Sequence, residues 1–378
     1  MLNNKGNLMH KSHIKVFLLM LSIIFSACHR EAENGSNKNT IIDLENDSPK
    51  DYLVSDLFKS AEFIPLETTN ESRLTEINEV LFFDGIYVIL DIRQKCLFGF
   101  DKNGRFRFKI FPKGKGPLEL NNITDYTINK KNKSIDIYDF SQRKIVSFDM
   151  LGNPLHEKKI DFFFREFACT SKGDYIIYAP DLVNSESVGS GAFVIDSLGK
   201  FERSFLKIDA KGKYIQPINC LSGYGDSIIL VSNYTKDIFI INNDKINKRF
   251  TVNYPNDWMQ SLMLSNGSGS LLNFVYLKKL DDPKSFSVFL NAITGREYHL
   301  NFILNDLFAL PITIPHLFKD SQTLLVFLNA EQKNDFQKIL SQKNLPPDFN
   351  KKLLNQLKLT VDKMEPSDNY LMIKLDVR

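Results

Sequence analysis

A short turn motif recurs along the sequence at an almost constant interval, and this recurrence constrains the fold more than any other feature. Each copy is an apolar residue followed by Asp or Asn and, in most copies, by a Gly three or four positions later. The copies begin at Phe100, Phe148, Ile195, Ile241 and Leu290, at intervals of 48, 47, 46 and 49 residues. Asp and Asn bond to nearby backbone, and Gly accepts the positive φ of tight hairpins. The recurrence therefore predicts a series of equivalent hairpins.

Strand-like segments flank these turns, and their number predicts the architecture. Two further strand-like runs precede a typical turn, such as 123–128 and 134–138 before the second copy. Four short strands in a repeat of about 46 residues are typical of a β-propeller blade. We therefore predict an all-β fold, a six-bladed β-propeller. Five blades are clear in the sequence, at 73–111, 122–161, 165–207, 215–252 and 259–301, and a sixth begins near residue 312.

The two ends of the chain supply strands that the sixth blade lacks. After residue 328 the pattern changes to helical spacing, which predicts a short helical insertion over 331–358. A strand-like run returns at 370–375, and another, 61–66, precedes the first blade. Pairing of these two runs would close the ring and remove two exposed sheet edges. Pro65 fits an edge strand, because proline has no N–H to donate.

The first 27 residues predict a signal peptide. A basic segment precedes the apolar run from Val16 to Phe25, which is too short to span a bilayer as a helix. Two small residues then precede Cys28, as in the lipobox of bacterial lipoproteins. We expect lipidation of Cys28, with an ordinary secretory signal as the alternative. Met1 and Met9 are equally good as start sites.

Maturation would leave a lipidated polar tether over 28–50 and the propeller over 51–378. The tether has no apolar periodicity and predicts a flexible spacer. The acyl chains would hold the protein to a membrane without a transmembrane helix. We therefore expect a lipid-anchored protein of the bacterial cell envelope at the outer membrane, with the surface and the periplasmic side both open.

Charge and cysteine content exclude two classes of protein. The sequence has 48 Lys and Arg against 45 Asp and Glu, and three of those lysines lie in the signal peptide. The mature chain is thus balanced in charge, and we expect no nucleic-acid partner. Four cysteines in 378 residues exclude a disulfide scaffold.

The sequence resembles the six-bladed β-propeller lipoproteins of Bacteroidota, relatives of the NHL and TolB-like propellers. The resemblance spans about 50–378 and rests on the signal with Cys28, the two end strands and the repeated turns. Its most specific segment is Lys113-Gly114-Lys115-Gly116-Pro117-Leu118-Glu119-Leu120, where the family tends to have Gly-x-Gly-Pro-Gly-Glu-Tyr. Leu118 and Leu120 replace the Gly and the Tyr of that pattern. The resemblance implies the architecture and the envelope location, and no particular activity.

Three loops between blades are candidate ligand sites. Loop 113–119 combines lysines, glycines and backbone N–H groups that could form an anion-binding nest, although a plain connection between blades is the alternative. Consecutive aromatics at 162–164 cannot all point inward from a strand, and 254–258 is a similar aromatic loop; packed loops are the alternative for both. The ligand-face candidates are Lys113, Lys115, Glu119, Arg165, Tyr254 and Trp258.

A metal site is a weaker hypothesis. Some propellers, such as lactonases and paraoxonases, hold Ca²⁺ near the central axis with oxygen ligands from inner strands. Four acidic residues near inner-strand starts could converge there, with solvated loop charges as the alternative: Glu76, Glu79, Asp125 and Glu166. The histidines do not cluster, and the sequence contains neither Cys-x-x-Cys nor Gly-x-Ser-x-Gly.

We therefore expect a non-catalytic, monomeric envelope propeller, without a cofactor, that binds a protein, peptide or glycan. The alternative is a Ca²⁺-dependent hydrolase of the lactonase or esterase type. A structural role in an envelope assembly is a third hypothesis. The residues that line the centre of the ring would discriminate between the first two.

Overall fold

The structure is a computed structural model, and its described residues all belong to one compact unit, Thr40–Arg378. They are 40–43, 50–182, 188–209, 220–232, 234–242, 245–253, 271–277, 285–291, 297–307, 317–318, 323–341 and 350–377. The predicted signal peptide and Cys28 lie outside these residues.

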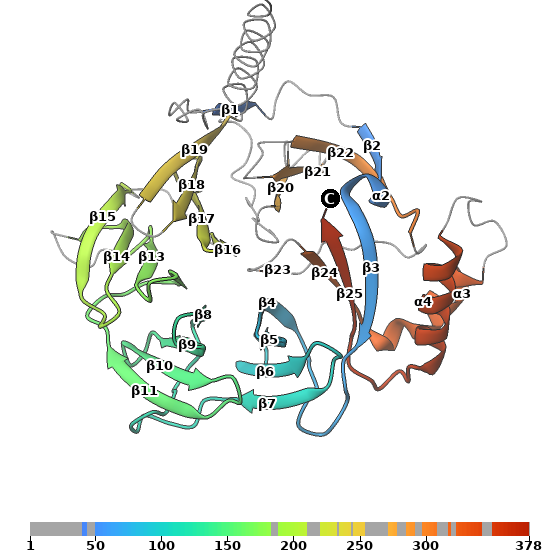
Figure 1. Cartoon of the computed structure of the whole chain (residues 1–378), viewed down its shortest axis with the longest axis horizontal. Helices are drawn as coiled ribbons and strands as arrows, with labels where there is room; N and C mark the ends of the chain where they lie inside the picture. Colours follow the sequence, from blue (N-terminus) through green and yellow to red (C-terminus); the bar gives the residue numbers. More distant parts are fainter. Residues whose placement is uncertain are drawn as a thin grey trace, which may run out of the picture. The chain divides into compact units, whose positions relative to one another are not determined.

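Six β-sheets surround a common centre within this unit, and we number them as blades 1 to 6 (Figure 1). Blade 1 contains β4 (Ile77–Phe83), β5 (Ile86–Asp91), β6 (Cys96–Asp101) and β7 (Phe106–Ile110). Blade 2 contains β8 (Asp125–Asn129), β9 (Ser134–Asp139), β10 (Lys144–Asp149) and β11 (Pro154–Lys159). Blade 3 contains β12 (Glu166–Cys169), β13 (Tyr175–Ala179), β14 (Gly191–Ile195) and β15 (Phe201–Lys207).

The other three blades continue the same order. Blade 4 contains β16 (Leu221–Tyr224), β17 (Ser227–Ser232), β18 (Asp237–Asn242) and β19 (Lys245–Asn253). Blade 5 contains β20 (Leu271–Leu277), β21 (Ser285–Asn291) and β22 (Glu297–Leu304). Blade 6 contains β24 (Thr323–Leu328), β25 (Leu371–Val377) and β3 (Phe58–Pro65). The predicted all-β, six-bladed propeller is confirmed.

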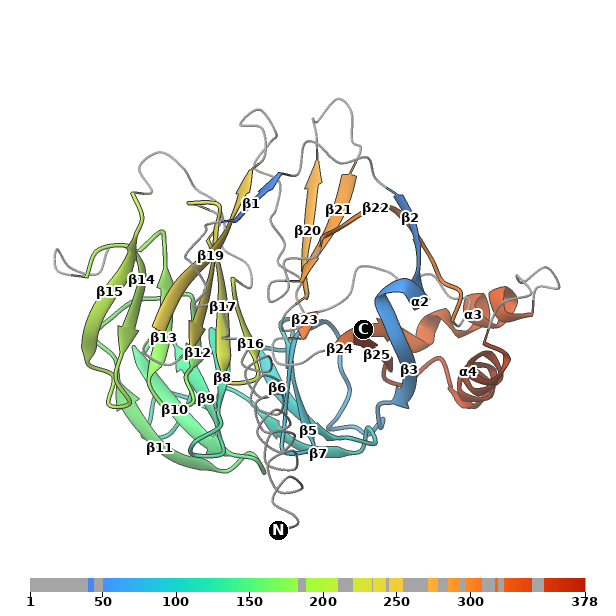
Figure 2. The ribbon, with the colours of Figure 1, turned by 45° about the horizontal axis from the view of Figure 1, so that its top comes forward.

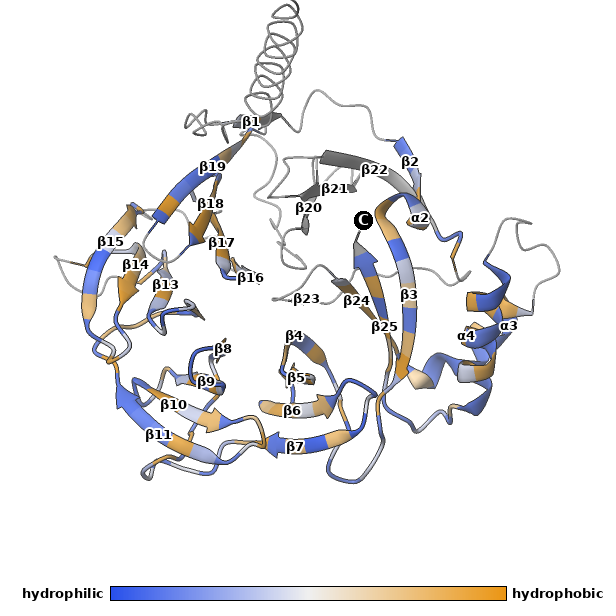
Figure 3. Cartoon of the chain, in the orientation of Figure 1, coloured by the Kyte–Doolittle hydropathy of each residue, from blue (hydrophilic) through white to orange (hydrophobic). Residues whose placement is uncertain are grey.

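The hydrophobic core lies between neighbouring blades. Phe108 of blade 1 packs in one buried cluster with Tyr126 and Ile137 of blade 2, and Tyr138 of blade 2 packs with Phe167 of blade 3. The second and third strands of a blade are mostly buried, and β6 and β9 are buried along their whole length. The outermost strand β11 is largely exposed and hydrophilic (Figure 3). Strand position in the blade therefore sets the apolar content of each strand.

The two chain ends close the ring as predicted. Strand β3 pairs antiparallel with β25, with Pro65 opposite Leu371 and Phe58 opposite Val377. Strand β3 forms the edge of its sheet, so the missing N–H of Pro65 interrupts no ladder. Leu66 continues the contact by donating its N–H to the Tyr370 carbonyl at 3.1 Å.

The helical insertion in the last blade is also confirmed. It consists of η1 (Ala330–Gln332), α3 (Lys333–Leu340) and α4 (Lys351–Lys363), and α4 runs past the predicted end at 358. Helices α3 and α4 lie outside the sheet of blade 6, against which Phe336 and Leu357 are buried (Figures 1 and 2). Among the described segments, no helix has the length and apolarity needed to cross a membrane.

Three short strands and one helix were not predicted. Strand β1 (Thr40–Asp43) pairs parallel with β19, and β2 (Lys50–Leu53) pairs parallel with β22. Strand β23 (Leu317–Phe318) pairs with β4, and α2 (Val54–Leu57) follows β2. The folded unit therefore begins at Thr40, inside the segment predicted as a tether over 28–50, because an outer blade strand leaves an open edge to which a β-branched segment can add.

Candidate functional site

The blades present two different faces. Neighbouring strands of a blade are antiparallel. The turn from strand 1 to strand 2 and the turn from strand 3 to strand 4 therefore lie on the same face of the ring, which we call the hairpin face. The turns from strand 2 to 3 and the loops between blades lie on the opposite face, the loop face. The ligand-face candidates that the structure describes, Lys113, Lys115, Glu119 and Arg165, all belong to loops of the loop face.

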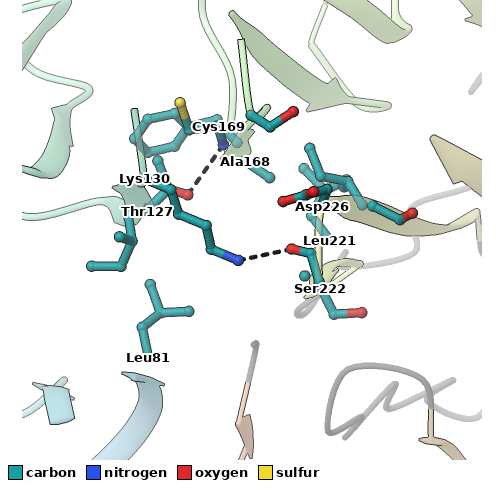
Figure 4. A pocket seen from close by; sticks show the side chains of 15 residues that line it. Leu81, Thr127, Lys130, Ala168, Cys169, Leu221, Ser222 and Asp226 are labelled. Atoms are coloured by element: carbon teal, nitrogen blue, oxygen red, sulfur yellow. Dashed lines mark hydrogen bonds between the residues drawn. The ribbon is translucent and has the colours of Figure 1, made fainter. Parts of the chain in front are cut away.

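A pocket opens instead among the hairpin-face ends of the inner strands of blades 1 to 4, and we call it the inner-strand pocket. Its walls come from β4, β8, β12 and β16 and from the hairpins that follow the last three (Figure 4). Its enclosed volume is small, about 40 Å³. Four blades thus converge on one concave site.

The pocket combines an apolar wall with a polar rim. Leu81, Ala168 and Leu221 supply apolar surface from three blades. The Lys130 Nζ donates to the Gly225 carbonyl at 2.8 Å, so this side chain joins blade 2 to blade 4 past blade 3 (Figure 4).

Two further polar groups are held by burial and hydrogen bonding. The Thr127 Oγ1 accepts from the Cys169 backbone N–H at 3.2 Å, which joins the inner strands of blades 2 and 3. Burial, and to a smaller extent the charge of Asp136, raise the pKa of the Cys169 thiol far above its ordinary value. Cys169 is therefore protonated at neutral pH and contributes a neutral wall rather than a nucleophile.

The inner-strand acids join neighbouring blades. The Asp125 Oδ2 accepts from the Phe167 N–H at 2.8 Å, from blade 2 to blade 3. The Glu166 Oε2 accepts from the backbone N–H groups of Cys220 and Leu221 at 2.6 and 3.1 Å, from blade 3 to blade 4. These carboxylates satisfy backbone donors on the open edge of the next inner strand, where an unsatisfied buried N–H would cost about 1–3 kcal/mol.

The four acids predicted as metal ligands do not gather at one point. Asp125 and Glu166 serve different blade joints, and Glu79 is buried in β4. Glu76 is exposed and lies 3.4 Å from Arg93 in an ion pair. Within the described segments, no group of three or more His, Cys, Asp or Glu side chains could hold a metal ion. Glu79, Asp125 and Glu166 lie on the inner strands of three successive blades, which separates them.

Loop 113–119 already contains an anion of its own. The Glu119 Oε2 accepts from the Gly116 N–H at 2.9 Å, and the Glu119 N–H donates to the Gly116 carbonyl at 3.1 Å. A Cβ on Gly114 or Gly116 would come within 2.5 or 2.9 Å of the Glu119 Oε2, so the Glu119 side chain would have to shift. Lys113 and Lys115 are exposed. Glu119 thus fills the place at which an external anion would meet these backbone donors.

Leu118 retains the left-handed backbone conformation that suits the Gly of the family pattern. Its φ is 59°, and its N–H donates to the Glu157 Oε2 at 2.8 Å. We expect Leu118→Gly to be more stable than Leu118→Ala by about 1 kcal/mol in urea unfolding, because only glycine relieves the strain. The order should reverse at Leu120, which has no positive φ, since glycine there only adds disorder to the unfolded chain. Equal stability of the two Leu118 variants would contradict this account.

The aromatic loop before blade 3 is packed. Phe164 is fully buried and stacks on Tyr138 with ring centroids 3.7 Å apart, and Phe162 packs edge-on against Phe193. The Arg165 Nε donates to the Asp181 Oδ2 at 2.8 Å. Tyr254 and Trp258 lie outside the described residues.

The inner-strand pocket was missed by sequence reasoning. Lys130, Ser171 and Asp226 look like ordinary polar residues in hairpins, and nothing in their local sequence separates them from Lys131. The one available signal was positional: all three lie at or just after the ends of inner strands on the same face.

Comparisons with known proteins agree with this fold. A family model described as a 6-bladed beta-propeller, DUF5128, matches residues 29–305, more than half of the chain. A search of curated proteins returned no match.

Solved structures give the same result. A Bacteroides fragilis protein described as exported is 15% identical to this chain, with a TM-score of 0.68. The match covers 90% of this chain and 100% of that protein. A Staphylococcus aureus virginiamycin B lyase has 13% identity and a TM-score of 0.40, covering 71% and 82%. A Bacteroides vulgatus member of the DUF4221 family has 10% identity and a TM-score of 0.38, covering 85% and 97%. The first similarity shows the fold, and the other two are too distant to support an activity.

Proposed function

The chain belongs to the 6-bladed β-propeller family DUF5128, and on that premise we propose that it is a non-catalytic recognition module of the bacterial cell envelope. Its ligand is a small molecule that enters the inner-strand pocket. The observation that carries this proposal is the meeting of four consecutive blades at one concave site with an apolar wall and a polar rim. A closed ring holds these groups in fixed positions without a conformational cost on binding.

The pocket favours a small molecule over the partners considered from the sequence. A peptide strand could add to an open inner edge, but side chains of the preceding blade already accept from the N–H groups of Phe167, Cys169 and Leu221. A glycan is commonly held on an exposed aromatic ring, whereas Phe167, the aromatic residue in the pocket wall, is 1% exposed.

The envelope location is part of the same proposal. The signal peptide pattern and the lipobox-like segment ending at Cys28 support export and lipidation, and the fold similarity to an exported Bacteroides fragilis protein agrees with them. We place the propeller as a monomer at the outer membrane, held by acyl chains on Cys28.

A hydrolase gains no specific support from the described residues. The Asp125 and Glu166 carboxylates accept backbone N–H groups, and the Cys169 thiol is protonated. These two side chains each direct one oxygen into a blade joint, where it holds a backbone N–H group.

The test is a pocket-filling variant, Ala168→Phe. Ala168 lies in the pocket wall on β12, so a phenyl ring there should occupy the ligand space. Purified protein is dialysed to equilibrium against a small-molecule extract of bacterial cells, and the compounds retained are measured by mass spectrometry. We expect the unmodified protein to enrich a compound that Ala168→Phe does not.

Two controls keep the outcome interpretable. Leu155→Phe places the same ring on the exposed outer strand β11 and should retain the compound. Ser171→Trp blocks the rim from a hairpin and replaces Ala168→Phe if that variant unfolds, as judged by circular dichroism. Enrichment of the same compounds by blocked and unblocked proteins would refute the pocket as the ligand site.

A further inference from the structure

We propose that the ligand of the inner-strand pocket is a small zwitterion of the α-amino acid class with an apolar side chain. This inference rests on the proposed function and specifies its ligand chemistry. The residues that line the pocket include one cation, Lys130, and one anion, Asp226. A ligand with a single charge would be attracted by one of them and repelled by the other. A zwitterion is attracted by both.

The position of Lys130 suits a carboxylate. Its Nζ is held 2.8 Å from the Gly225 carbonyl at the β16–β17 hairpin (Figure 4). A hydrogen bond from an ammonium to a carboxylate is stronger than one to a neutral carbonyl. A ligand carboxylate therefore attracts the Lys130 ammonium more strongly than the neutral Gly225 carbonyl does.

The position of Asp226 suits an ammonium. It directly follows Gly225 in the chain, so the carboxylate is placed by the same hairpin that holds Lys130. Asp226 is exposed, which leaves its oxygens accessible from the pocket mouth. The two opposite charges thus border one rim.

The remaining wall selects the rest of the ligand. Leu81, Ala168 and Leu221 offer apolar surface that favours a short aliphatic side chain. Hydroxyl groups of Ser171 and Ser227 at the rim can bond to the ligand carboxylate or ammonium. An internal residue of a peptide carries neither charge, so a free amino acid fits this arrangement better than a chain.

Calorimetry with defined probes tests the proposal. L-alanine, L-valine and L-leucine are the zwitterions; propionate and propylamine carry one of the two charges each. We expect at least one amino acid to bind at millimolar concentration or below, and propionate and propylamine to bind at least about tenfold more weakly.

Variants assign the two charges. Lys130→Met and Asp226→Asn should each weaken amino-acid binding by about tenfold or more. Lys131→Met is the matched control: the neighbouring lysine also donates to a hairpin carbonyl, that of Lys172 at 2.8 Å, but it does not line the pocket, and its loss should leave binding unchanged.

The outcomes separate this inference from the proposed function. If dialysis enriches a compound other than a zwitterion and Ala168→Phe abolishes that enrichment, the recognition module stands and the amino-acid assignment is overturned. Absence of binding by all three amino acids at millimolar concentration, or equal binding of propionate and alanine, also overturns it. Equal effects of Lys130→Met and Lys131→Met on amino-acid binding would show that Lys130 does not bind the ligand carboxylate.

Discussion

Replacing Gly104 by Ala is expected to lower the free energy of unfolding by about 3 kcal/mol, because the hairpin that carries it has no room for a methyl group. Gly104 lies in the β6–β7 hairpin with φ at 82°, a region that costs other residues about 1–2 kcal/mol. A Cβ there would overlap the Pro65 carbonyl oxygen, which belongs to the backbone and cannot rotate away. Such overpacking adds about 1–3 kcal/mol.

Two other glycines separate these contributions. Gly85 has φ at 80° and open space around it, so Gly85→Ala should cost only the conformational part, about 1 kcal/mol. Gly152 has φ at 84°, and its Cβ would lie 3.0 Å from the Phe108 side chain, a milder overlap than at Gly104, so Gly152→Ala should fall between the two. Urea unfolding followed by circular dichroism measures all three. Equal losses for Gly85→Ala and Gly104→Ala would show that the contact with Pro65 adds nothing.

The hairpin glycines have a second role that the turn pattern did not reveal. Gly104 meets Pro65 of β3, Gly152 meets Phe108 of β7, and Gly199 meets Ile160 just after β11. In each case the turn between the third and fourth strands of a blade approaches the outer strand of the blade before it, or the residue that follows that strand. The glycine recurs because the turn needs positive φ and because the next blade must pack closely on the last one.

The features that could be predicted from the sequence are those with a local chemical cause. Turn glycines and Asp side chains act within a few residues, so the repeat and the blade count follow from them. Ring closure was predictable because 61–66 and 370–375 were strand-like runs without partners in a pattern that otherwise assigned every strand. Fold class and closure therefore required no knowledge of contacts between distant blades.

The features that escaped prediction depend on such contacts. Strand β1 forms only because β19 offers an open edge, and nothing between 28 and 50 marks that edge in advance. Lys130 matters because the β16–β17 hairpin of blade 4 lies across the pocket from it. Glu119 was grouped with two lysines as a ligand candidate, whereas its carboxylate turns back onto Gly116.

One further repeat was present in the sequence and was overlooked. Asp91 and Gln94 in blade 1 recur as Asp139 and Gln142 in blade 2, 48 residues later, the interval of the hairpin motif. In both blades the Asp ends the second strand and accepts hydrogen bonds from the Gln three residues on. The same Asp also accepts backbone N–H groups of the segment that leads into its own blade, including that of Thr75 in blade 1.

Asp139→Asn is expected to lower the free energy of unfolding by about 3 kcal/mol, although it changes one atom of the side chain. Asp139 is fully buried, and its Oδ2 accepts from the N–H groups of Asn121 and Asn122 and from the Gln142 Nε2, at 2.7, 3.2 and 2.7 Å. Its Oδ1 accepts from the Ser141 hydroxyl and the Gln142 N–H at 2.6 and 3.1 Å. The amide nitrogen of asparagine is a donor, so at either oxygen position it would face other donors and the hydrogen bonds of that oxygen would be lost. Each hydrogen bond to a charged acceptor contributes about 1.5–3 kcal/mol.

The pH dependence gives an independent measurement of the same group. Burial alone would raise the pKa of Asp139, but hydrogen bonds from Ser141, Gln142, Asn121 and Asn122 hold it below its ordinary value. A carboxyl whose pKa is lower in the folded state stabilises the protein above its unfolded pKa of about 4, and that contribution is lost as the pH falls through the folded value. Urea unfolding should therefore show a smaller loss of stability from about pH 5 to about pH 3 for Asp139→Asn than for the unmodified protein. These two pH values lie about one unit either side of the unfolded pKa.

A turn aspartate provides the matched control for the substitution. The Asp196 Oδ1 accepts from the N–H groups of Leu198 and Lys200 at 2.9 and 2.8 Å in the β14–β15 hairpin, and asparagine offers the same oxygen in such turns. Asp196→Asn should therefore cost less than about 1 kcal/mol. Because the two substitutions share their chemistry and differ in how many donors surround the carboxylate, similar losses from both would mean that the buried hydrogen-bond cluster at Asp139 does not stabilise the blade.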